Sequence, residues 1–409
     1  MQCRAYDPGR DQDAVLRIIR EVGWTRPGKD DLWTPYLTCG RVLVADLDGQ
    51  PECLVATAPG AMRYLTEDLP LAEVTAVATS HIARRQRFAR RLLARALAEA
   101  VADGAVISRV CIFDQGFYNR VGFGTGGYEH TLLFDPSALR VNAEPRVPRR
   151  LTVEDSALMH ASRLARRRGH GAANYPSATI TELEARFPDK ALGLGYCDGP
   201  NGELTHHFWC AADHLEWGPY HIKWLVFQTP DQFLELLALI KSLGDQVHLV
   251  RMREPQGIQL QDLLHRPFRH YQMTEKSRFE NRMAAVAFWQ VRILDLPKCL
   301  AQTRLPSGET RFNLELTDPI EPLLDDDAPW RGVAGNYIVT LGKTSAAESG
   351  SDPALPTLKA SVNAFSRLWF GVRPATGLAV TDDLSGPQSL LEELDSTLRL
   401  PDPKPDWDF

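Results

Sequence analysis

The fold is indicated most clearly by residues 74–97, VTAVATSHIARRQRFARRLLARAL. Residues 74–79 predict a strand, and apolar residues at helical spacing from Phe88 to Leu97 predict an amphipathic helix. An arginine-rich turn joins the two. A turn that opens a helix presents unpaired backbone N–H groups and the positive end of the helix dipole. This stretch is therefore suited to binding a pyrophosphate.

Strand and helix patterns alternate on both sides of this stretch. RVLVADL (41–47) and CLVATA (53–58) flank a turn-forming segment and predict a β-hairpin. AVISRVCI (105–112) predicts the next strand, which is followed by FDQGFYNRVGFG (113–124). The proline- and arginine-rich NAEPRVPRR (142–150) marks a domain boundary.

The chain of 409 residues is longer than one hydrophobic core usually organises. WQVRILDLPKCL (289–300) opens a third unit after a second stretch of mixed strands and helices. We therefore expect an α/β (α+β) protein with domains at 1–141, 142–288 and 289–409. Residues 151–290 contain no basic turn at a helix start, so we assign the central domain no chemistry.

Composition narrows the class of protein. The net charge of −6 gives no electrostatic footprint for nucleic acid or an anionic membrane. We see no apolar run of membrane-spanning length and no apolar core of a signal peptide near the first residues. The seven cysteines form no CxxC pair, which predicts neither a disulfide framework nor a zinc site. We expect a cytoplasmic protein without a metal.

The basic turn resembles the acetyl-CoA signature of GNAT acetyltransferases, R/Q-x-x-G-x-G/A. Arg84 and Ala89 match it, whereas Arg87 stands where the signature has glycine. Arginine there either crowds the phosphates or supplies an extra charged contact. The alternative is an arginine-rich, solvated helix start. The resemblance implies acetyl-CoA as co-substrate, held by Thr75, Ala76, Val77, Arg84, Arg85, Gln86, Arg87, Phe88, Ala89, Arg90, Phe113 and Asp114.

A second segment, DQGFYNRVGFG (114–124), resembles the Y-x-R-x-G-[YF]-G segment of the Eis family of GNAT enzymes. Tyr118 falls on that family's catalytic tyrosine, which protonates the departing thiolate. An unperturbed phenol, with a pKa of about 10, is closely matched to a thiol and suits this task. The alternative is that Tyr118 only packs below the sheet.

A third resemblance lies at the other end of the chain. Residues 366–398, followed by a tail ending in Asp408 and Phe409, resemble the C-terminal region of Eis proteins, which has a sterol-carrier-protein-like fold. In that family the main-chain carboxylate of the terminal phenylalanine is the general base, which implies this role for Phe409. Asp408 is a rival base, and the alternative to both is a frayed terminus.

The resemblance implies an N-acetyltransferase for amines of a cationic small molecule, such as an aminoglycoside or a polyamine, or of lysine. It also implies a homohexamer, in which each chain has two GNAT-type mixed-sheet domains, the central one without a cofactor loop, followed by the sterol-carrier-protein-like α+β domain. The acidic tail favours a cationic acceptor, with Asp408 as a substrate-binding residue. Trp24 and Trp33 are candidates for the pocket wall, with core packing as their alternative.

Two other functions remain open at this point. The chain could be a non-catalytic protein that binds acetyl-CoA or a lipid, and acetyl-CoA binding without turnover would support this. It could also run another acyl or small-molecule reaction in a biosynthetic pathway, for which a neighbourhood of biosynthetic genes would argue.

Overall fold

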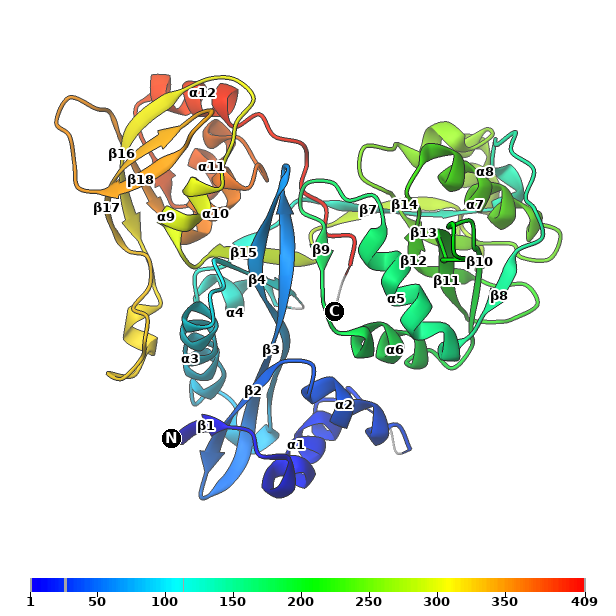
Figure 1. Cartoon of the computed structure of the whole chain (residues 1–409), viewed down its shortest axis with the longest axis horizontal. Coiled ribbons are helices and arrows are strands. Elements are labelled where there is room, and N and C mark those ends of the chain that lie inside the picture. Colours follow the sequence, from blue (N-terminus) through cyan, green and yellow to red (C-terminus); the bar gives the residue numbers. More distant parts are fainter. Residues whose placement is uncertain (1, 26–27, 113, 408–409) are drawn as a thin grey trace. The chain divides into compact units, whose positions relative to one another are not determined.

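The computed structural model describes residues 2–25, 28–112 and 114–407. The chain forms two compact units, which Figure 1 shows by sequence colour. The first comprises Met1–Gly127, His170–Pro176 and Ala287–Phe409; the second comprises Tyr128–Gly169 and Ser177–Val286. Several mixed sheets with helices packed on them confirm the predicted α/β class. Among the helices of the described residues, none is both long and apolar enough to cross a bilayer.

The first sheet has the strand order β1-β2-β3-β4-β5-β15-β6, with β9 beside β3. Among its described strands, only β4 and β5 run parallel; the other pairs are antiparallel. The strands are β1 (Gln2–Ala5), β2 (Arg41–Leu47), β3 (Gln50–Tyr64), β4 (Glu67–Thr79), β5 (Ile107–Cys111), β6 (Gly124–Thr125), β9 (Ala173–Asn174) and β15 (Trp289–Ile293).

Strand β15 departs from the position that the sequence suggested. The sequence pattern predicts that this segment opens a third unit, whereas the structure inserts it between β5 and β6. All five of its residues are buried. A strand that is covered on both faces belongs in the interior of a sheet, and β15 therefore completes the first sheet.

Helices cover both faces of this sheet. The face formed by Val42, Val44 and Leu54 packs against α1 and α2, and the opposite face, with Leu43 and Val55, packs against α3 (Figure 1). This alternation along β2 and β3 follows from the two-residue period of a strand. The helices of this part are α1 (Pro8–Glu21), α2 (Trp33–Leu37), α3 (Phe88–Ala102) and α4 (Gln115–Asn119).

The first unit also contains a smaller sheet of order β18-β17-β16-β19-β20. Asn363 ties this part to the segment around α4, because its Nδ2 donates to the carbonyls of Asn119 and Phe123 at 2.8 and 2.7 Å. The elements are α9 (Leu296–Ala301), β16 (Thr310–Thr317), β17 (Gly335–Leu341), β18 (Ala346–Ser349), β19 (Thr357–Ser361), α10 (Val362–Trp369), α11 (Ala375–Thr381), β20 (Leu384–Ser385) and α12 (Gln388–Thr397).

The second unit is built on a sheet of order β14-β7-β13-β12-β11-β10-β8. Its one parallel pair among the described strands, β12 and β13, is joined through α7. The elements are β7 (Glu129–Phe134), β8 (Arg149–Leu151), α5 (Ser156–Ala165), α6 (Ala178–Arg186), β10 (Ala191–Tyr196), β11 (His206–Ala212), β12 (Tyr220–Val226), α7 (Pro230–Ser242), β13 (Val250–Arg253), α8 (Pro267–Thr274) and β14 (Arg282–Val286).

Candidate active site

The parallel strands β4 and β5 separate partway along their length. They pair from Leu71 with Ile107 to Val74 with Val110 and no further. Beyond Val74, β4 continues to Thr79, and β3 is its only partner among the described strands. This stretch of β4 therefore has a free edge, which an extended ligand can pair with as an added strand.

A β-bulge lies at the start of this free edge. Ala56 on β3 pairs with Ala76, and Thr57 pairs with Val74, so Thr75 is an extra residue on β4. Bulges re-aim a strand and are common beside active sites. The predicted contacts Thr75, Ala76 and Val77 thus lie on the free stretch of β4.

An aromatic run leads from the surface to this bulge. The Tyr36 hydroxyl donates to the Thr75 carbonyl at 2.8 Å. The Trp33 ring contacts Tyr36 edge-on with ring centroids 5.0 Å apart, and Trp24 stacks on Trp33 at 5.9 Å. Trp33 is buried, whereas Trp24 is 37% exposed. The two predicted pocket residues therefore lie together and connect to β4 through Tyr36, a residue that was not among the predicted site residues.

The start of α3 has the geometry that the glycine of the signature provides. Arg87 is its N-cap residue and has φ +67°, in the left-handed region that favours glycine. Its side chain makes no capping hydrogen bond. The backbone of the basic turn thus follows a path suited to glycine although arginine occupies it, and the first N–H groups of α3 have no side-chain cap.

The side chains of the turn differ in their pairing. Within the described residues, Arg84, Arg85, Arg87 and Arg90 take part in no ion pair, whereas Arg91 pairs with Asp325 at 2.6 Å and Arg95 pairs with Asp327 at 2.8 Å. The first three are exposed and Arg90 is half-buried. Four positive charges without acidic partners surround an uncapped helix start, as an anionic ligand requires. Gln86 is also exposed and bonds to the Ile82 carbonyl.

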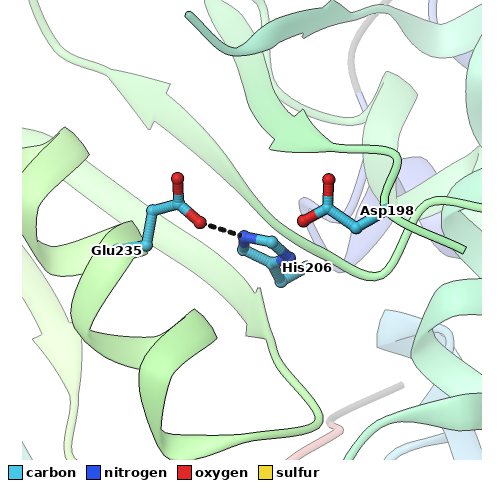
Figure 2. A group of neighbouring side chains, drawn as sticks. All are labelled: Asp198, His206 and Glu235. Carbon is cyan, nitrogen blue, oxygen red and sulfur yellow. Dashed lines mark hydrogen bonds and ion pairs between the residues drawn. The ribbon is translucent and has the colours of Figure 1, made fainter. Parts of the chain in front are cut away.

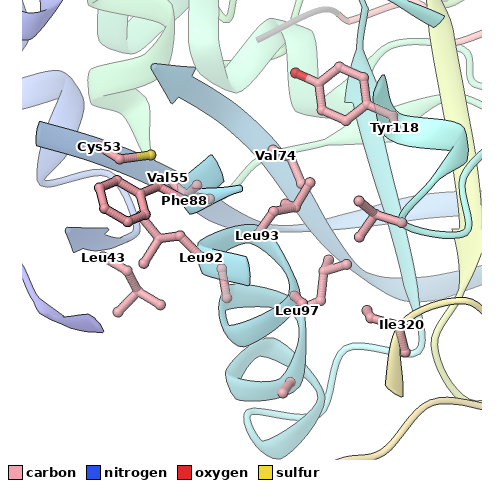
Figure 3. Packing of buried hydrophobic residues seen from close by; sticks show 14 of the residues in the cluster. Leu43, Cys53, Val55, Val74, Phe88, Leu92, Leu93, Leu97, Tyr118 and Ile320 are labelled. Carbon is pink, nitrogen blue, oxygen red and sulfur yellow. The ribbon is translucent and has the colours of Figure 1, made fainter. Parts of the chain in front are cut away.

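Tyr118 lies on α4, the short helix that follows β5. It is buried in the cluster that contains Val74, Phe88 and Val110, and Figure 3 shows its ring at the edge of that cluster. Burial raises the pKa of the phenol, and Cys111 and Asp114 raise it further. The pKa of Tyr118 is therefore higher than that of the unperturbed phenol, which was closely matched to a thiol. The phenol stays protonated at neutral pH, as a general acid requires.

Some residues that were predicted to contact acetyl-CoA have side chains that are already engaged within the protein. Asp114 caps α4, because its carboxylate accepts from the Phe117 N–H. Phe88 is buried in the core cluster, where it packs against the sheet. Phe113, Asp408 and Phe409 lie outside the described residues.

The end of the described chain is held beside the separating strands. Trp407 is buried, with 1% of its surface exposed. Its main-chain carbonyl accepts a hydrogen bond of 2.8 Å from Arg109 Nη2 on β5. Arg109 pairs with Glu73 at 2.8 Å, and these residues face each other in the register, one position before the last β4–β5 pair.

Asp198, His206 and Glu235 in the second unit offer ligand atoms within 4.8 Å of one another (Figure 2). Arg146 already supplies a positive charge to them, because it donates two hydrogen bonds to each carboxylate. His206 Nε2 lies 3.0 Å from Glu235, and burial lowers the pKa of His206. A guanidinium and a neutral imidazole explain this group as a hydrogen-bond network, so we assign no metal to it.

Comparisons with known proteins agree with this geometry. Residues 10–126 match the model of the acetyltransferase (GNAT) domain. A search of curated proteins found no match. The matched domain makes the chain an acyltransferase and implies acetyl-CoA as its co-substrate.

Solved structures share the fold over nearly the whole chain. A probable N-acyltransferase from Enterococcus faecalis is 17% identical with a TM-score of 0.77, covering 98% of this chain and 96% of its own. Eis1 from Mycobacterium abscessus is 14% identical with a TM-score of 0.76, covering 100% of both chains. A GCN5-related N-acetyltransferase from Kribbella flavida is 17% identical with a TM-score of 0.74, covering 97% and 96%.

Proposed function

We propose that the chain transfers the acetyl group of acetyl-CoA to an amine of a cationic small molecule, of the aminoglycoside or polyamine kind, or of lysine. The pyrophosphate binds at the start of α3, and the rest of the coenzyme pairs with the free edge of β4. The observation that carries this proposal is the coincidence of three features at one place: a split between parallel strands, an uncapped basic helix start and a buried tyrosine on the next element.

The proposed chemistry is direct transfer. The amine nitrogen attacks the thioester carbon, the C–N bond forms and the C–S bond breaks. A strand N–H polarises the carbonyl. Tyr118 donates a proton to the departing thiolate, and the same burial that raises the pKa of the phenol also raises that of a thiol bound beside it. The main-chain carboxylate of Phe409 removes the proton from the attacking ammonium, directly or through one water.

The position of Trp407 supports this role for the tail. The carbonyl of Trp407, two residues before Phe409 in the sequence, is held by Arg109 at the point where β4 and β5 separate. Trp24 and Trp33 line the acceptor side, and acidic residues of the tail, Asp408 among them, favour a cation there.

Coenzyme A release measured against a panel of amines tests the activity. We expect turnover with polyamines, aminoglycosides or lysine peptides and none with neutral alcohols. Adding residues after Phe409, or deleting it, should reduce kcat by about 10² or more while acetyl-CoA still binds, whereas Asp408→Asn should mainly weaken acceptor binding. Full activity of the extended protein would rule out the terminal carboxylate as base.

We also propose three domains over residues 1–141, 142–288 and 289–409, of which the last adds strand β15 to the first sheet, together with a sterol-carrier-protein-like fold for the last domain and a homohexameric assembly. These three proposals rest on the resemblance to Eis-like proteins. Analytical ultracentrifugation at micromolar concentration tests the assembly, and a monomer would contradict it.

A further inference from the structure

Arg109 is a fully buried arginine at the base of the β4–β5 split, and the acetyl-transfer chemistry leaves it without a role. Its Nε donates to Glu73 Oε2 at 2.8 Å, and its Nη2 donates to the Tyr175 hydroxyl at 2.7 Å and to the Trp407 carbonyl at 2.8 Å. Glu73, Arg109 and Tyr175 are all 0% exposed. Burial of a charge pair is costly unless its hydrogen bonds are met, so this arrangement needs an explanation.

The segment that contains Tyr175 holds the tail at two more points. The Tyr175 and Trp407 rings meet edge-on at 5.3 Å and 90°. The main-chain N–H of Lys404 donates to the His170 carbonyl at 3.0 Å. Strand β9, between these two residues, pairs with β3 and so fixes the segment to the first sheet. The tail is therefore bound over four residues to a frame that is itself part of the sheet.

The bond to Trp407 is made to a main-chain atom, which fixes the path of the chain rather than one side chain. Arg109 Nη1 and Glu73 Oε1 have no hydrogen-bond partner within the described residues, although both atoms are buried. Buried polar atoms are rarely left unmet, so the pair has capacity for a further polar group next to Trp407.

We infer that Glu73, Arg109 and Tyr175 form a tail clamp that positions the C-terminal tail across the acetyl-transfer site. The inference rests on the proposed function, since the tail is the segment that carries the proposed base. Arg109 is a positioning residue: it acts on the reaction through the tail and does not touch the acetyl group. Glu73 holds the guanidinium in place, and Tyr175 links it to the ring of Trp407.

Two variants test the clamp. Arg109→Lys keeps a positive charge but cannot make all three bonds, and Tyr175→Phe keeps the ring contact with Trp407 while it removes one partner of Arg109. Arg163→Lys is the control, because Arg163 is a buried arginine of the second unit that pairs with Glu184. For each folded variant we would measure the release of Phe409 by a carboxypeptidase, the kcat, and the affinity for acetyl-CoA by calorimetry.

We expect Arg109→Lys to release Phe409 about tenfold faster and to lower kcat about tenfold, with acetyl-CoA affinity unchanged. Tyr175→Phe should show the same pattern more weakly and decides the question if Arg109→Lys does not fold. The control should lose thermal stability but keep both release and kcat within about twofold of the wild type.

The outcomes separate the clamp from the proposed base. Faster release with unchanged kcat would confirm the clamp and count against the terminal carboxylate as base. Unchanged release in the folded variants would overturn the clamp, whatever happens to kcat. A fall in acetyl-CoA affinity that matches the fall in kcat would also overturn it, because Arg109 would then act on the coenzyme and not on the tail.

Discussion

The two units contain the same arrangement of strands and helix but differ where the helix begins. In each, a parallel strand pair separates after a few residues, and a helix joins the two strands: β4, α3 and β5 in the first unit, and β12, α7 and β13 in the second. Helix α7 begins with a capping box, in which Thr229 accepts from the Gln232 N–H and Gln232 accepts from the Thr229 N–H. Helix α3 has no such cap.

This difference shows where the fold leaves a site for an anion. A capping box satisfies the first N–H groups of a helix with atoms of the chain itself. The start of α7 therefore has little to offer a phosphate. The start of α3 keeps its N–H groups uncapped and adds arginines that have no acidic partner in the described part of the chain. Both units contain a pair of parallel strands that separate, but we expect acetyl-CoA to bind only in the first unit, at the start of α3.

The largest expected effect is the loss of kcat when Tyr118 is changed. We propose no counterpart of Tyr118 in the second unit. Tyr118→Phe should lower kcat by about 10² to 10⁴ because thiolate protonation fails, with the ring still packed. The melting temperature and acetyl-CoA affinity should stay close to those of the wild type. Steady-state kinetics and calorimetry check this, and turnover at wild-type speed would make Tyr118 a structural residue only.

Acid should affect the two units through different histidines. In the first unit, His170 Nδ1 accepts from the Leu65 N–H and Nε2 bonds the Phe370 carbonyl, and burial lowers the pKa of His170 to about 4. The folded state therefore resists protonation that the unfolded chain accepts below about pH 6.5. Stability from this group is complete above that pH and declines as pH falls toward 4, by up to about 3 kcal/mol.

Comparison with His170→Asn isolates this contribution, because other buried groups also titrate. The pKa of His207 in the second unit, for example, is lowered to about 3 by burial and by the charge of Arg163. Urea unfolding at pH 7, 5.5 and 4.5 should show a flatter pH dependence for the variant. Equal slopes for the two proteins would contradict the role of His170.

Much of this comparison could be predicted from the sequence, because the features concerned depend on residues that are close together in the chain. The hairpin of β2 and β3, helix α3 and the basic turn follow from patterns within about 20 residues, which periodicity reports well. The absence of a basic turn in residues 151–290 also predicted the contrast between α3 and α7. Nothing in the local pattern shows that Arg87 adopts a positive φ, and the resemblance to a glycine position raised only the question of space for the phosphates.

The tail clamp was missed because its contacts are distant in sequence. Glu73 and Arg109 are 36 residues apart, and Arg109 and Trp407 are 298 apart. A signal was present: each charge stands within an otherwise apolar strand, LAEVTAV and VISRVCI. Charges at such positions are rarely buried unless paired, so two of them in neighbouring strands predict a buried pair. The insertion of β15 into the first sheet, 178 residues after β5 ends, has no comparable signal.

Removing the arginines at the start of α3 should have a smaller effect than the Tyr118 variant and a larger effect than a change in the backbone of the turn. Arg84→Ala with Arg85→Ala should weaken acetyl-CoA binding by more than about 1 kcal/mol, as expected for lost charge-assisted bonds. Arg91→Ala is the control, since Asp325 already occupies that side chain, and it should change binding by less than about 0.5 kcal/mol. Unchanged calorimetric affinity in the double variant would remove the site from this helix start.

The smallest expected effect tests the backbone of the basic turn. Arg87→Gly removes the side chain at φ +67°, where a residue with a Cβ costs about 1 kcal/mol, and should therefore raise the unfolding free energy by a fraction of that amount. Arg266 is a matched control in the second unit, because it is also an uncapped N-cap residue, at φ +49°, before α8. Arg266→Gly should give a similar gain in stability without a change in acetyl-CoA binding.

If Arg87 contacts phosphate, Arg87→Gly should weaken acetyl-CoA binding about threefold, which is less than the effect of the Arg84→Ala and Arg85→Ala double variant. We expect this result, because the exposed side chain has no acidic partner within the described residues. Tighter binding would show instead that the arginine obstructs the approach of the phosphates, and that the glycine of the signature is needed for space as well as for conformation.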